Sequence, residues 1–264
     1  MIKTDILIIG AGPTGLFAVF EAGLLQLKCH IIDALPMPGG QLSELYPKKP
    51  IYDIPGFPEV LAGDLVHNLM EQIKPFSPGF TLGERAEKID KQLDGSFIVT
   101  TDKGTAHHTK VVAIAGGLGS FEPKKPLIEG IESWEDKGVS YMIKDPEVYR
   151  DKKVLIAGGG DSALDWSIFL AEVASEVTLV HRRSEFRGAL DSVEKVQALK
   201  NSGKINLITP AEVIGLAGNT HLNKVYIQKT GEETPIELTV DAFIPLFGLS
   251  PKLGPIGAWG LEIE

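Results

Sequence analysis

Residues 153–187 restrict the fold of this chain more than any other stretch. They begin with an apolar run, residues 154–157, of the kind that forms a buried strand in a parallel sheet. A G-x-G-x-x-A turn follows at Gly158, and residues 164–174 and 177–180 then predict a helix and a second strand. Because a strand precedes the glycine motif and a helix follows it, the pattern favours a dinucleotide-binding βαβ unit over a tight turn alone.

Each small residue of this turn has a physical reason to be there. Gly158 permits the tight turn, and Gly160 lets backbone N–H groups approach a pyrophosphate at the helix N-terminus. Ala163 allows the helix to pack closely on the strand. Asp161 and Ser162, within the same turn, join Gly158 and Gly160 as candidate cofactor-binding residues.

The second strand of the unit ends in basic residues. His181, Arg182 and Arg183 follow the strand directly, and Arg187 lies four residues further on. An NAD site usually has an acidic residue here, whereas guanidinium groups form bidentate bonds with a 2′-phosphate. The sequence therefore favours NADPH over NADH and assigns all four residues to its binding, the alternative being a solvated basic strand end.

A second glycine motif lies near the N-terminus. Residues 5–9 predict a strand, GAGPTG begins at Gly10, residues 16–25 predict a helix, and the next strand, residues 30–32, ends in Asp33. Its carboxylate has the spacing expected of a ribose ligand, although it could also be only a strand-end cap. The chain is therefore predicted to be an α/β protein with two Rossmann-like domains that hold different dinucleotides.

The loop of residues 36–58 is rich in Pro and Gly, so we expect little regular structure there. It is also apolar, which indicates that it packs against something. Gly39 and Gly40 would let the backbone come close to a flat ring, and Gln41 could hydrogen-bond the edge of that ring.

Composition narrows the classes of function. The 264 residues suffice for two domains, and a net charge of −9 argues against a general nucleic-acid surface. No apolar run approaches membrane-spanning length, and we expect neither a signal peptide nor a membrane partner. The single cysteine, Cys29, is predicted to be a small core residue in a reducing, cytoplasmic environment. His107 and His108 are expected on a solvated surface strand, and no metal-ligand spacing is evident.

Taken together, the motifs resemble those of the two-dinucleotide flavoprotein reductases, and most of all the bacterial ferredoxin–NADP reductases of the thioredoxin-reductase-like type. The resemblance covers essentially the whole chain. The motifs that carry it are GAGPTG at Gly10, PGGQLSELYP at Pro38, IYDIPGFP at Ile51, GGGDSALDW at Gly158, HRRSEFR at His181 and GLSPKLGPIGAWGLEIE at Gly248.

The resemblance implies FAD on the first unit and NADPH on the second, with the NADPH domain, residues 121–242, inserted into an FAD domain of residues 1–120 and 243–264. Tyr46 would stack on the isoalloxazine ring, unless it is only a loop aromatic packed on Pro47. The full FAD set that it implies is Gly10, Gly12, Pro13, Thr14, Gly15, Asp33, Gly40, Gln41, Tyr46, Ala86 and Phe121.

Two departures from related enzymes matter. Thioredoxin reductases have C-x-x-C just before the second glycine motif, but residues 141–145 here are Tyr-Met-Ile-Lys-Asp, so a dithiol relay to a protein disulfide is not expected. The family also continues past Glu264 with a flavin-binding Gly-Asp segment. We therefore expect part of the FAD site to lie outside this sequence. For that reason a non-catalytic, nucleotide-binding redox sensor remains an alternative function.

The function that the resemblance implies is electron transfer between NADPH and ferredoxin or flavodoxin through FAD. No side-chain catalyst is needed, because the cofactors carry the hydride chemistry. An NADPH diaphorase or quinone reductase is the alternative. Docking of an acidic partner would need a local basic patch, for which Lys48–Lys49 and Lys124–Lys125 are candidates. A homodimer is implied by the resemblance alone.

Overall fold

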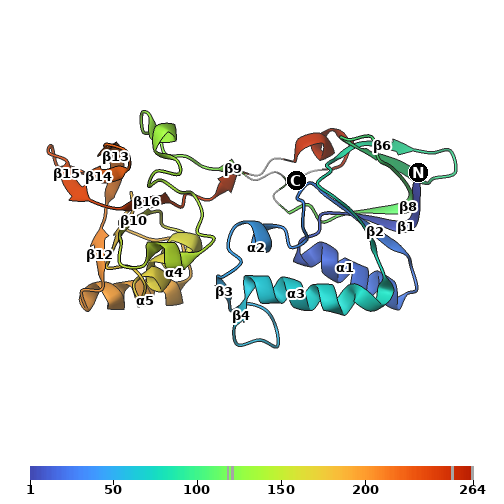
Figure 1. Ribbon diagram of the computed structural model, residues 1–264, viewed down its shortest axis with the longest axis horizontal. Helices are drawn as coiled ribbons and strands as arrows, with labels where there is room; N and C mark the ends of the chain where they lie inside the picture. The colour runs from blue at the N-terminus through green and yellow to red at the C-terminus, as the bar shows by residue number, and fades with distance from the viewer. Residues whose placement is uncertain (118, 120–121, 251–252, 263–264) are drawn as a thin grey trace. The chain divides into compact units, whose positions relative to one another are not determined.

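The computed structural model describes residues 1–117, 119, 122–250 and 253–262. The chain divides into two compact units, Met1–Phe121 with Pro251–Glu264, and Glu122–Ser250 (Figure 1). The second unit is thus inserted into the first. The first boundary lies within a residue of the sequence expectation, whereas the second lies after Ser250 rather than before residue 243.

The first unit is built on a six-stranded sheet in the order β5-β2-β1-β8-β7-β6. The first four strands of that order are parallel, and β8 pairs antiparallel with β7 and β7 with β6. The strands are β1 Ile2–Ile9, β2 Cys29–Asp33, β5 Gly79–Leu82, β6 Ala86–Lys91, β7 Phe97–Thr101 and β8 Ala106–Ile114.

Two helices, α1 Pro13–Leu24 and α3 Ala62–Ile73, lie together along one face of this sheet (Figure 1). The 3-10 helix η1 Lys74–Phe76 extends α3. Alternate residues of β1 divide between the two faces, as a strand with period two requires. Ile8 packs under the helices with Leu16 and Val66, and Leu7 packs on the opposite face.

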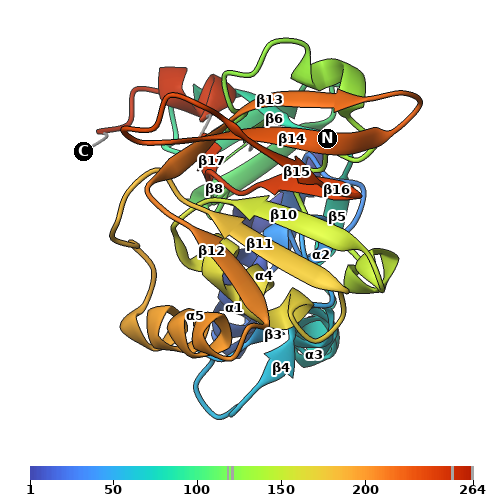
Figure 2. The ribbon, with the colours of Figure 1, turned by 90° about the vertical axis from the view of Figure 1, so that its left-hand side faces the viewer.

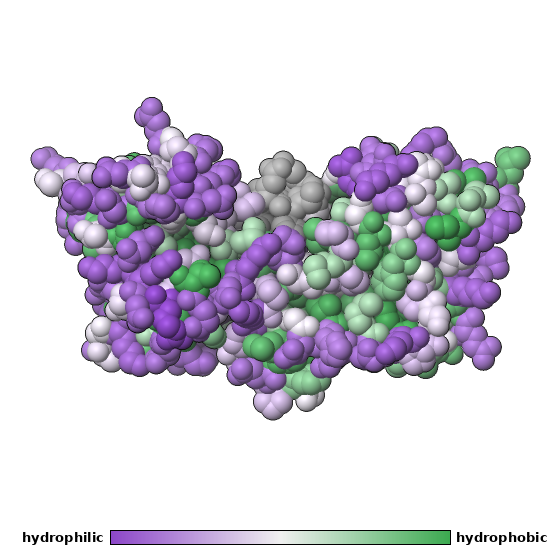
Figure 3. All heavy atoms as spheres, in the orientation of Figure 1, coloured by the Kyte–Doolittle hydropathy of each residue, from purple (hydrophilic) through white to green (hydrophobic). Residues whose placement is uncertain are grey.

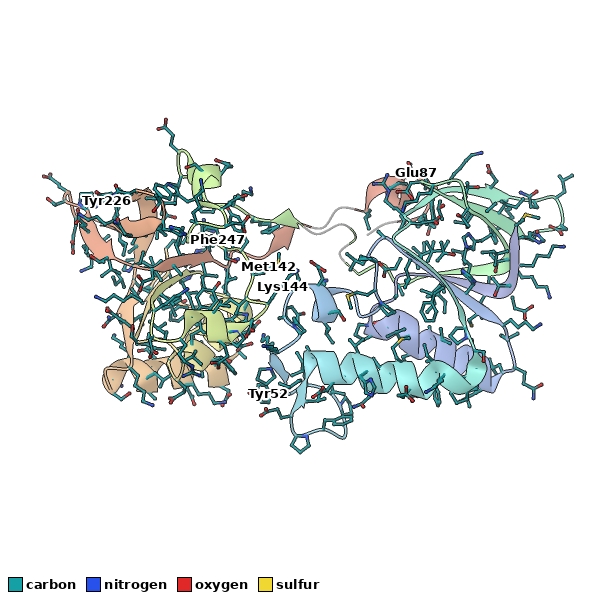
Figure 4. The ribbon with its side chains drawn as sticks, viewed as in Figure 1. Tyr52, Glu87, Met142, Lys144, Tyr226 and Phe247 are labelled. Carbon is teal, nitrogen blue, oxygen red and sulfur yellow. The ribbon has the colours of Figure 1, made fainter. Side chains whose placement is uncertain are left out.

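The opposite face is covered by the C-terminal segment, which forms the 3-10 helix η4 Gly254–Ala258. Ile256 and Trp259 pack against the apolar cluster of that face. The Trp259 Nε1–H donates to the Glu87 carbonyl oxygen at 3.3 Å, and Figure 4 shows Glu87 beside η4. Residues 253–262 therefore belong to the first unit.

The Pro- and Gly-rich loop holds short elements: α2 Gln41–Glu44 and a hairpin of β3 Pro50–Ile51 with β4 Val60–Leu61. Its packing is partial. Leu45 is buried, but 65% of Tyr52 is exposed, and Tyr52 lies in the outer part of the loop in Figure 4.

The second unit contains four parallel strands in the order β12-β11-β10-β16 (Figure 2). Helices α4 Asp161–Leu170 and α5 Leu190–Asn201 pack on these strands. The strands are β10 Lys153–Ala157, β11 Glu176–Val180, β12 Ile205–Ile208 and β16 Ala242–Pro245. Since β16 is hydrogen-bonded to β10, it belongs to this unit, which explains why the unit runs past residue 243.

A three-stranded antiparallel sheet, β13-β14-β15, completes the core of this unit. Leu155 and Phe243 of the parallel sheet pack with Val225 and Ile227 of the antiparallel one. Hydrophilic residues cover most of the face of this unit that Figure 3 shows, because its apolar residues lie inside. The remaining elements are β13 Ala211–Gly218, β14 Leu222–Lys229, β15 Ile236–Thr239, η2 Ile131–Trp134, η3 Pro146–Tyr149 and the pair β9 Glu122–Pro123 with β17 Leu249–Ser250.

Two single-residue predictions have different outcomes. Cys29 is buried on β2, which confirms its prediction as a core residue. His107 was expected on a solvated strand, and this is wrong: its side chain has no exposed surface, because its ring packs beside His30 and its Nε2 lies 2.9 Å from the Thr81 hydroxyl on one face of the sheet. His108 is half-buried, and its Nε2 lies 2.8 Å from the Ser96 hydroxyl.

Within the described part of the chain, no three His, Cys, Asp or Glu side chains gather as a metal site. None of the described helices combines the length and the apolar character that crossing a bilayer requires.

Candidate dinucleotide-binding sites

The first glycine turn joins β1 to α1 and leaves no room for side chains at two positions. Gly10 has φ +108°, and a Cβ there would lie 2.3 Å from the Ala115 carbonyl oxygen. A Cβ on Gly15 would lie 1.9 Å from the Gly10 carbonyl oxygen. Both glycines are therefore required by close backbone contacts, as the motif predicts.

Gly12 has a different environment, because no atom lies within 4 Å of the position a Cβ would take. It is the N-cap of α1 and forms no side-chain cap. Pro13 has no N–H, so Thr14 and Gly15 carry the first backbone donors of the helix, which lack intrahelical acceptors. Open space in front of a helix N-terminus suits a pyrophosphate, so these residues fit a dinucleotide.

Asp33, at the end of β2, is tied to this turn. Its Oδ2 accepts a hydrogen bond from the Ala11 N–H at 2.6 Å, and its Oδ1 accepts one from the Leu35 N–H at 2.8 Å. The carboxylate therefore acts as a strand-end cap. Each oxygen keeps further acceptor capacity for a ribose hydroxyl, so the two interpretations of Asp33 are compatible.

The loop after β2 returns to the same turn. The Gly39 N–H donates to the Ala11 carbonyl oxygen at 2.8 Å. A Cβ on Gly40 would lie 3.2 Å from the Gly12 Cα, so this glycine allows the loop to approach. Gln41 Nε2 lies 3.7 Å from the Cβ position of Gly117, which has φ +56°. Gly117 is absent from the predicted set, although the glycine run at the end of β8 was a signal for it.

The remaining predicted FAD residues differ in what they offer. Tyr46 is half-buried, and the Lys49 Nζ lies 5.7 Å from the centroid of its ring. Its pKa is raised, mainly by burial and to a lesser extent by the negative charge of Asp53. Ala86 is buried in the apolar cluster under η4, so only its backbone could contact a cofactor. Phe121 lies outside the described residues.

The second glycine turn repeats the geometry of the first. A Cβ on Gly158 would lie 2.6 Å from the Leu246 carbonyl oxygen and 2.7 Å from the Ala163 Cβ. Gly160 is the N-cap of α4, and, as at Gly12, no atom lies within 4 Å of the position that a Cβ would take. A dinucleotide pyrophosphate therefore fits at this helix N-terminus too.

The segment of residues 182–187, here called the arginine segment, folds back onto this turn. The Arg187 N–H donates to the Gly159 carbonyl oxygen at 2.7 Å, and the Ala189 N–H donates to Asp161 Oδ1 at the same distance. The carboxylate of Asp161 therefore holds the backbone just after the segment, while Ser162 is exposed in the first turn of α4.

The three arginines, Arg182, Arg183 and Arg187, are exposed. Among the described residues, none of their guanidinium groups takes part in an ion pair. Exposed guanidinium groups on a segment whose backbone is tied to the glycine turn suit a doubly charged anion such as a 2′-phosphate.

His181, which was predicted to bind the cofactor with the arginines, is buried. Its ring stacks on Phe186 with centroids 5.2 Å apart, and its Nε2–H donates to the Glu185 carbonyl oxygen at 3.1 Å. Burial lowers its pKa, so the ring is neutral near pH 7. Its side chain therefore packs behind the arginine segment.

Comparisons with known proteins agree with this geometry. Residues 4–264 match the family model described as pyridine nucleotide-disulphide oxidoreductase. The chain is 78% identical over 264 residues to the ferredoxin–NADP reductase of Flavobacterium johnsoniae, in an alignment that covers all of this chain and 75% of that protein. It is 77% identical to ferredoxin–NADP reductase 1 of Christiangramia forsetii, with the same coverage.

The fold comparison points the same way. The structure of T. acidophilum thioredoxin reductase superposes with a TM-score of 0.86 at 21% identity, over all of this chain and 83% of that one. This likeness concerns the fold.

The chain belongs to the ferredoxin–NADP reductases. The resemblance stated from the motifs is thereby confirmed, together with the fold of two Rossmann-like domains. Membership of this family makes the chain an FAD-dependent oxidoreductase that uses NADP(H).

The stretch where thioredoxin reductases carry their cysteines lies in the second unit. Met142 and Lys144 project from it in Figure 4 and line a cavity of about 440 Å³. The Tyr141 hydroxyl donates to Glu135 Oε1 at 3.0 Å, and burial together with this carboxylate raises the pKa of Tyr141. Residues 141–145 include no thiol, so the stretch offers no dithiol for electron relay.

The candidate basic pairs also differ from each other. Lys48 and Lys124 are exposed. Lys125 forms an ion pair with Glu135 at 2.5 Å, which offsets its charge.

Proposed function

We propose that this chain transfers electrons between NADPH and ferredoxin through FAD, with FAD bound by the first unit and NADPH by the second. The observation that carries the assignment of the two units is the chemistry at the end of the second strand of each. The first has a carboxylate, Asp33, whereas the second has the exposed Arg182, Arg183 and Arg187. A carboxylate suits ribose hydroxyls and repels a 2′-phosphate, which guanidinium groups attract.

In the first unit, Gly12 leaves open the approach to the N-terminus of α1, and the donors of Thr14 and Gly15 would hold the FAD pyrophosphate. Asp33 would bind the adenosine ribose. Gly40 and Gln41 lie on the loop that returns to this turn, where they would position the flavin portion.

In the second unit, Gly160 leaves the corresponding approach open at α4. The arginine segment would bind the 2′-phosphate and so distinguish NADPH from NADH. When bound, FAD supplies a ring that accepts a hydride from NADPH and releases electrons singly to a partner. The residues of this chain bind and orient both cofactors, and none is needed as a general base or nucleophile.

Flavodoxin is a second candidate partner, and we infer a cytoplasmic homodimer from the family resemblance. An acidic partner would dock at a local basic patch, for which Lys48 and Lys49 of the first unit and, separately, Lys124 and Lys125 of the second unit are candidates. Reversal of Lys48 and Lys49 to Glu should slow reduction of ferredoxin several-fold at low salt and less at high salt, because screening weakens steering. Turnover measured across a salt series checks this, and an unchanged salt dependence would remove these lysines from the docking surface.

The test of the proposed function is an anaerobic titration of the protein with bound FAD, using NADPH and separately NADH while flavin absorbance is followed. We expect bleaching at a much lower concentration of NADPH than of NADH. Flavin that binds but stays oxidised with both nucleotides would contradict the proposed activity, and equal response to both would contradict the role of the arginines.

A further inference from the structure

The pairing of the strands makes Asp33 and His181 equivalent positions. In the first unit the Gly10 N–H donates to the Ile32 carbonyl oxygen, and in the second the Gly158 N–H donates to that of Val180. The next residue along the chain is Asp33 in one case and His181 in the other. A buried histidine therefore occupies the position where the first unit has its candidate ribose ligand.

The middle residues of the two turns are equivalent as well, and they explain what His181 does. In the first unit this residue is Ala11, whose N–H reaches Asp33. In the second it is Gly159, and a Cβ there would lie 2.1 to 2.4 Å from three atoms of the His181 ring. Gly159 does not have a positive φ, so its backbone conformation does not call for glycine. A glycine is needed at this position because the His181 ring occupies the space of a Cβ.

The same ring is joined to the arginine segment. Its Nε2–H reaches the Glu185 carbonyl oxygen, and its face stacks on Phe186. The carbonyl of Gly159 in turn accepts the Arg187 N–H. The segment is thus tied to the glycine turn through His181 and Gly159 together.

From this arrangement we propose that His181 is a positioning residue, and that its contact with Gly159 sets where Arg182, Arg183 and Arg187 meet the 2′-phosphate. The ring binds no part of the nucleotide itself. It holds the backbone from which the arginines project, so it determines the preference for NADPH over NADH. This inference rests on the proposed function of the second unit.

The test compares binding of 2′,5′-ADP and 5′-AMP by calorimetry, because the two ligands differ only in the 2′-phosphate. The ratio of their affinities isolates that subsite and does not depend on flavin. His181→Ala should lower the ratio by about tenfold, since misplaced guanidinium groups lose a charge-assisted bond. Gly159→Ala should lower it at least as much, because its Cβ displaces the ring.

The double variant Gly159→Ala/His181→Ala sharpens the test. Removal of the ring relieves the clash, so the double variant should bind no worse than His181→Ala alone, whereas independent effects would multiply. His181→Phe keeps the ring and loses the hydrogen bond, so its ratio should lie between those of the wild type and His181→Ala. His221→Ala removes an exposed histidine of the same unit and should leave the ratio unchanged.

Two results would overturn the proposal, and they are distinguishable. If the wild type discriminates between the ligands but His181→Ala and Gly159→Ala do so equally well, the positioning role is wrong and the proposed function stands. If the wild type itself binds both ligands equally, the 2′-phosphate site is wrong, and the inference fails with it.

Discussion

The two units of this chain share one strand order and one geometry of the glycine turn. They differ in the residues that follow the second strand of the glycine motif. The order β5-β2-β1-β8 of the first unit corresponds to β12-β11-β10-β16 of the second. In each, the first glycine closely approaches the residue just after the last strand of that order, and the second glycine faces open space. The second strand is followed by Asp33 in one unit and by His181 with the arginine segment in the other.

This difference separates two tasks that a dinucleotide site must perform. The glycine turn and the helix N-terminus receive a pyrophosphate in either unit, because they act through backbone donors. In our proposal, the residue after the second strand supports the turn, and this residue or the segment that follows it selects the form of the ribose. Asp33 can do both with one carboxylate, whereas the second unit divides them between a buried histidine and exposed arginines.

The largest expected effect comes from adding a side chain to the last glycine of the first motif, whose counterpart in the second motif is an alanine. Gly15→Ala should destabilise the first unit by several kcal/mol and abolish FAD binding, because its Cβ would overlap the Gly10 carbonyl oxygen. The matched change in the second unit, Ala163→Gly, only removes a methyl group and should cost about 1 kcal/mol. Thermal unfolding and flavin retention check both, and retained flavin in Gly15→Ala would contradict the close approach.

The next effect tests the strand-end difference directly. Arg182→Ala/Arg183→Ala should weaken NADPH binding about 100-fold and leave NADH binding nearly unchanged, since each charge-assisted bond to phosphate contributes about 1.5 kcal/mol. Arg150→Ala is a matched control, because that exposed arginine pairs with Glu147 in the same unit. An equal loss for both nucleotides would mean that the arginines do not bind the 2′-phosphate.

Asp33→Asn makes the corresponding change in the first unit. It keeps the size of the side chain but removes the charge and one of the two oxygens that accept the Ala11 and Leu35 N–H groups, so FAD affinity should fall about tenfold. Asp5→Asn is the control, because Asp5 accepts the Lys28 N–H away from the turn. Unchanged flavin affinity in Asp33→Asn would mean that Asp33 only caps the end of β2 and does not bind the ribose.

The smallest effect concerns a buried pair of histidines in the first unit. His30 and His107 both lie within 2.9 Å of the Thr81 hydroxyl, and burial lowers the pKa of His30 to about 4. The folded state then binds fewer protons than the unfolded state between about pH 6.5 and pH 4, so stability falls as the pH falls through this window. The expected loss from pH 6 to pH 5 is about 1 kcal/mol.

Denaturant unfolding at a series of pH values measures this effect. His30→Gln should flatten the pH dependence, and His67→Gln, on the exposed side of α3, should not. If the free energy of unfolding depends on pH equally in His30→Gln and the wild type, other groups cause the acid sensitivity.

Local patterns account for the parts of the fold that could be predicted. Both glycine motifs lie between a strand and a helix, as expected, because an apolar run and small residues at fixed spacing have a local physical cause. The helix starts were less accurate: α1 begins at Pro13 and α4 at Asp161, a few residues before the apolar pattern of each. Strand β5 was not predicted, because its four residues, the first of which is a glycine, are too few to establish a pattern.

Long-range pairing explains the errors at single residues. The boundary near residue 243 was wrong because β16 becomes part of the second unit only through its hydrogen bonds to β10. His107 was misplaced because the residues that bury its ring, His30 and Thr81, are far from it in the sequence.

The sequence by itself determined that this chain has two dinucleotide units, and that one ends in a carboxylate and the other in arginines. Those features depend on residue type and spacing within short segments. Only the tertiary structure decided that His181 is equivalent to Asp33 and packs on Gly159, and that the two units share one strand order. The physical reason is that such contacts join residues brought together by strand pairing, which spacing along the chain does not reveal.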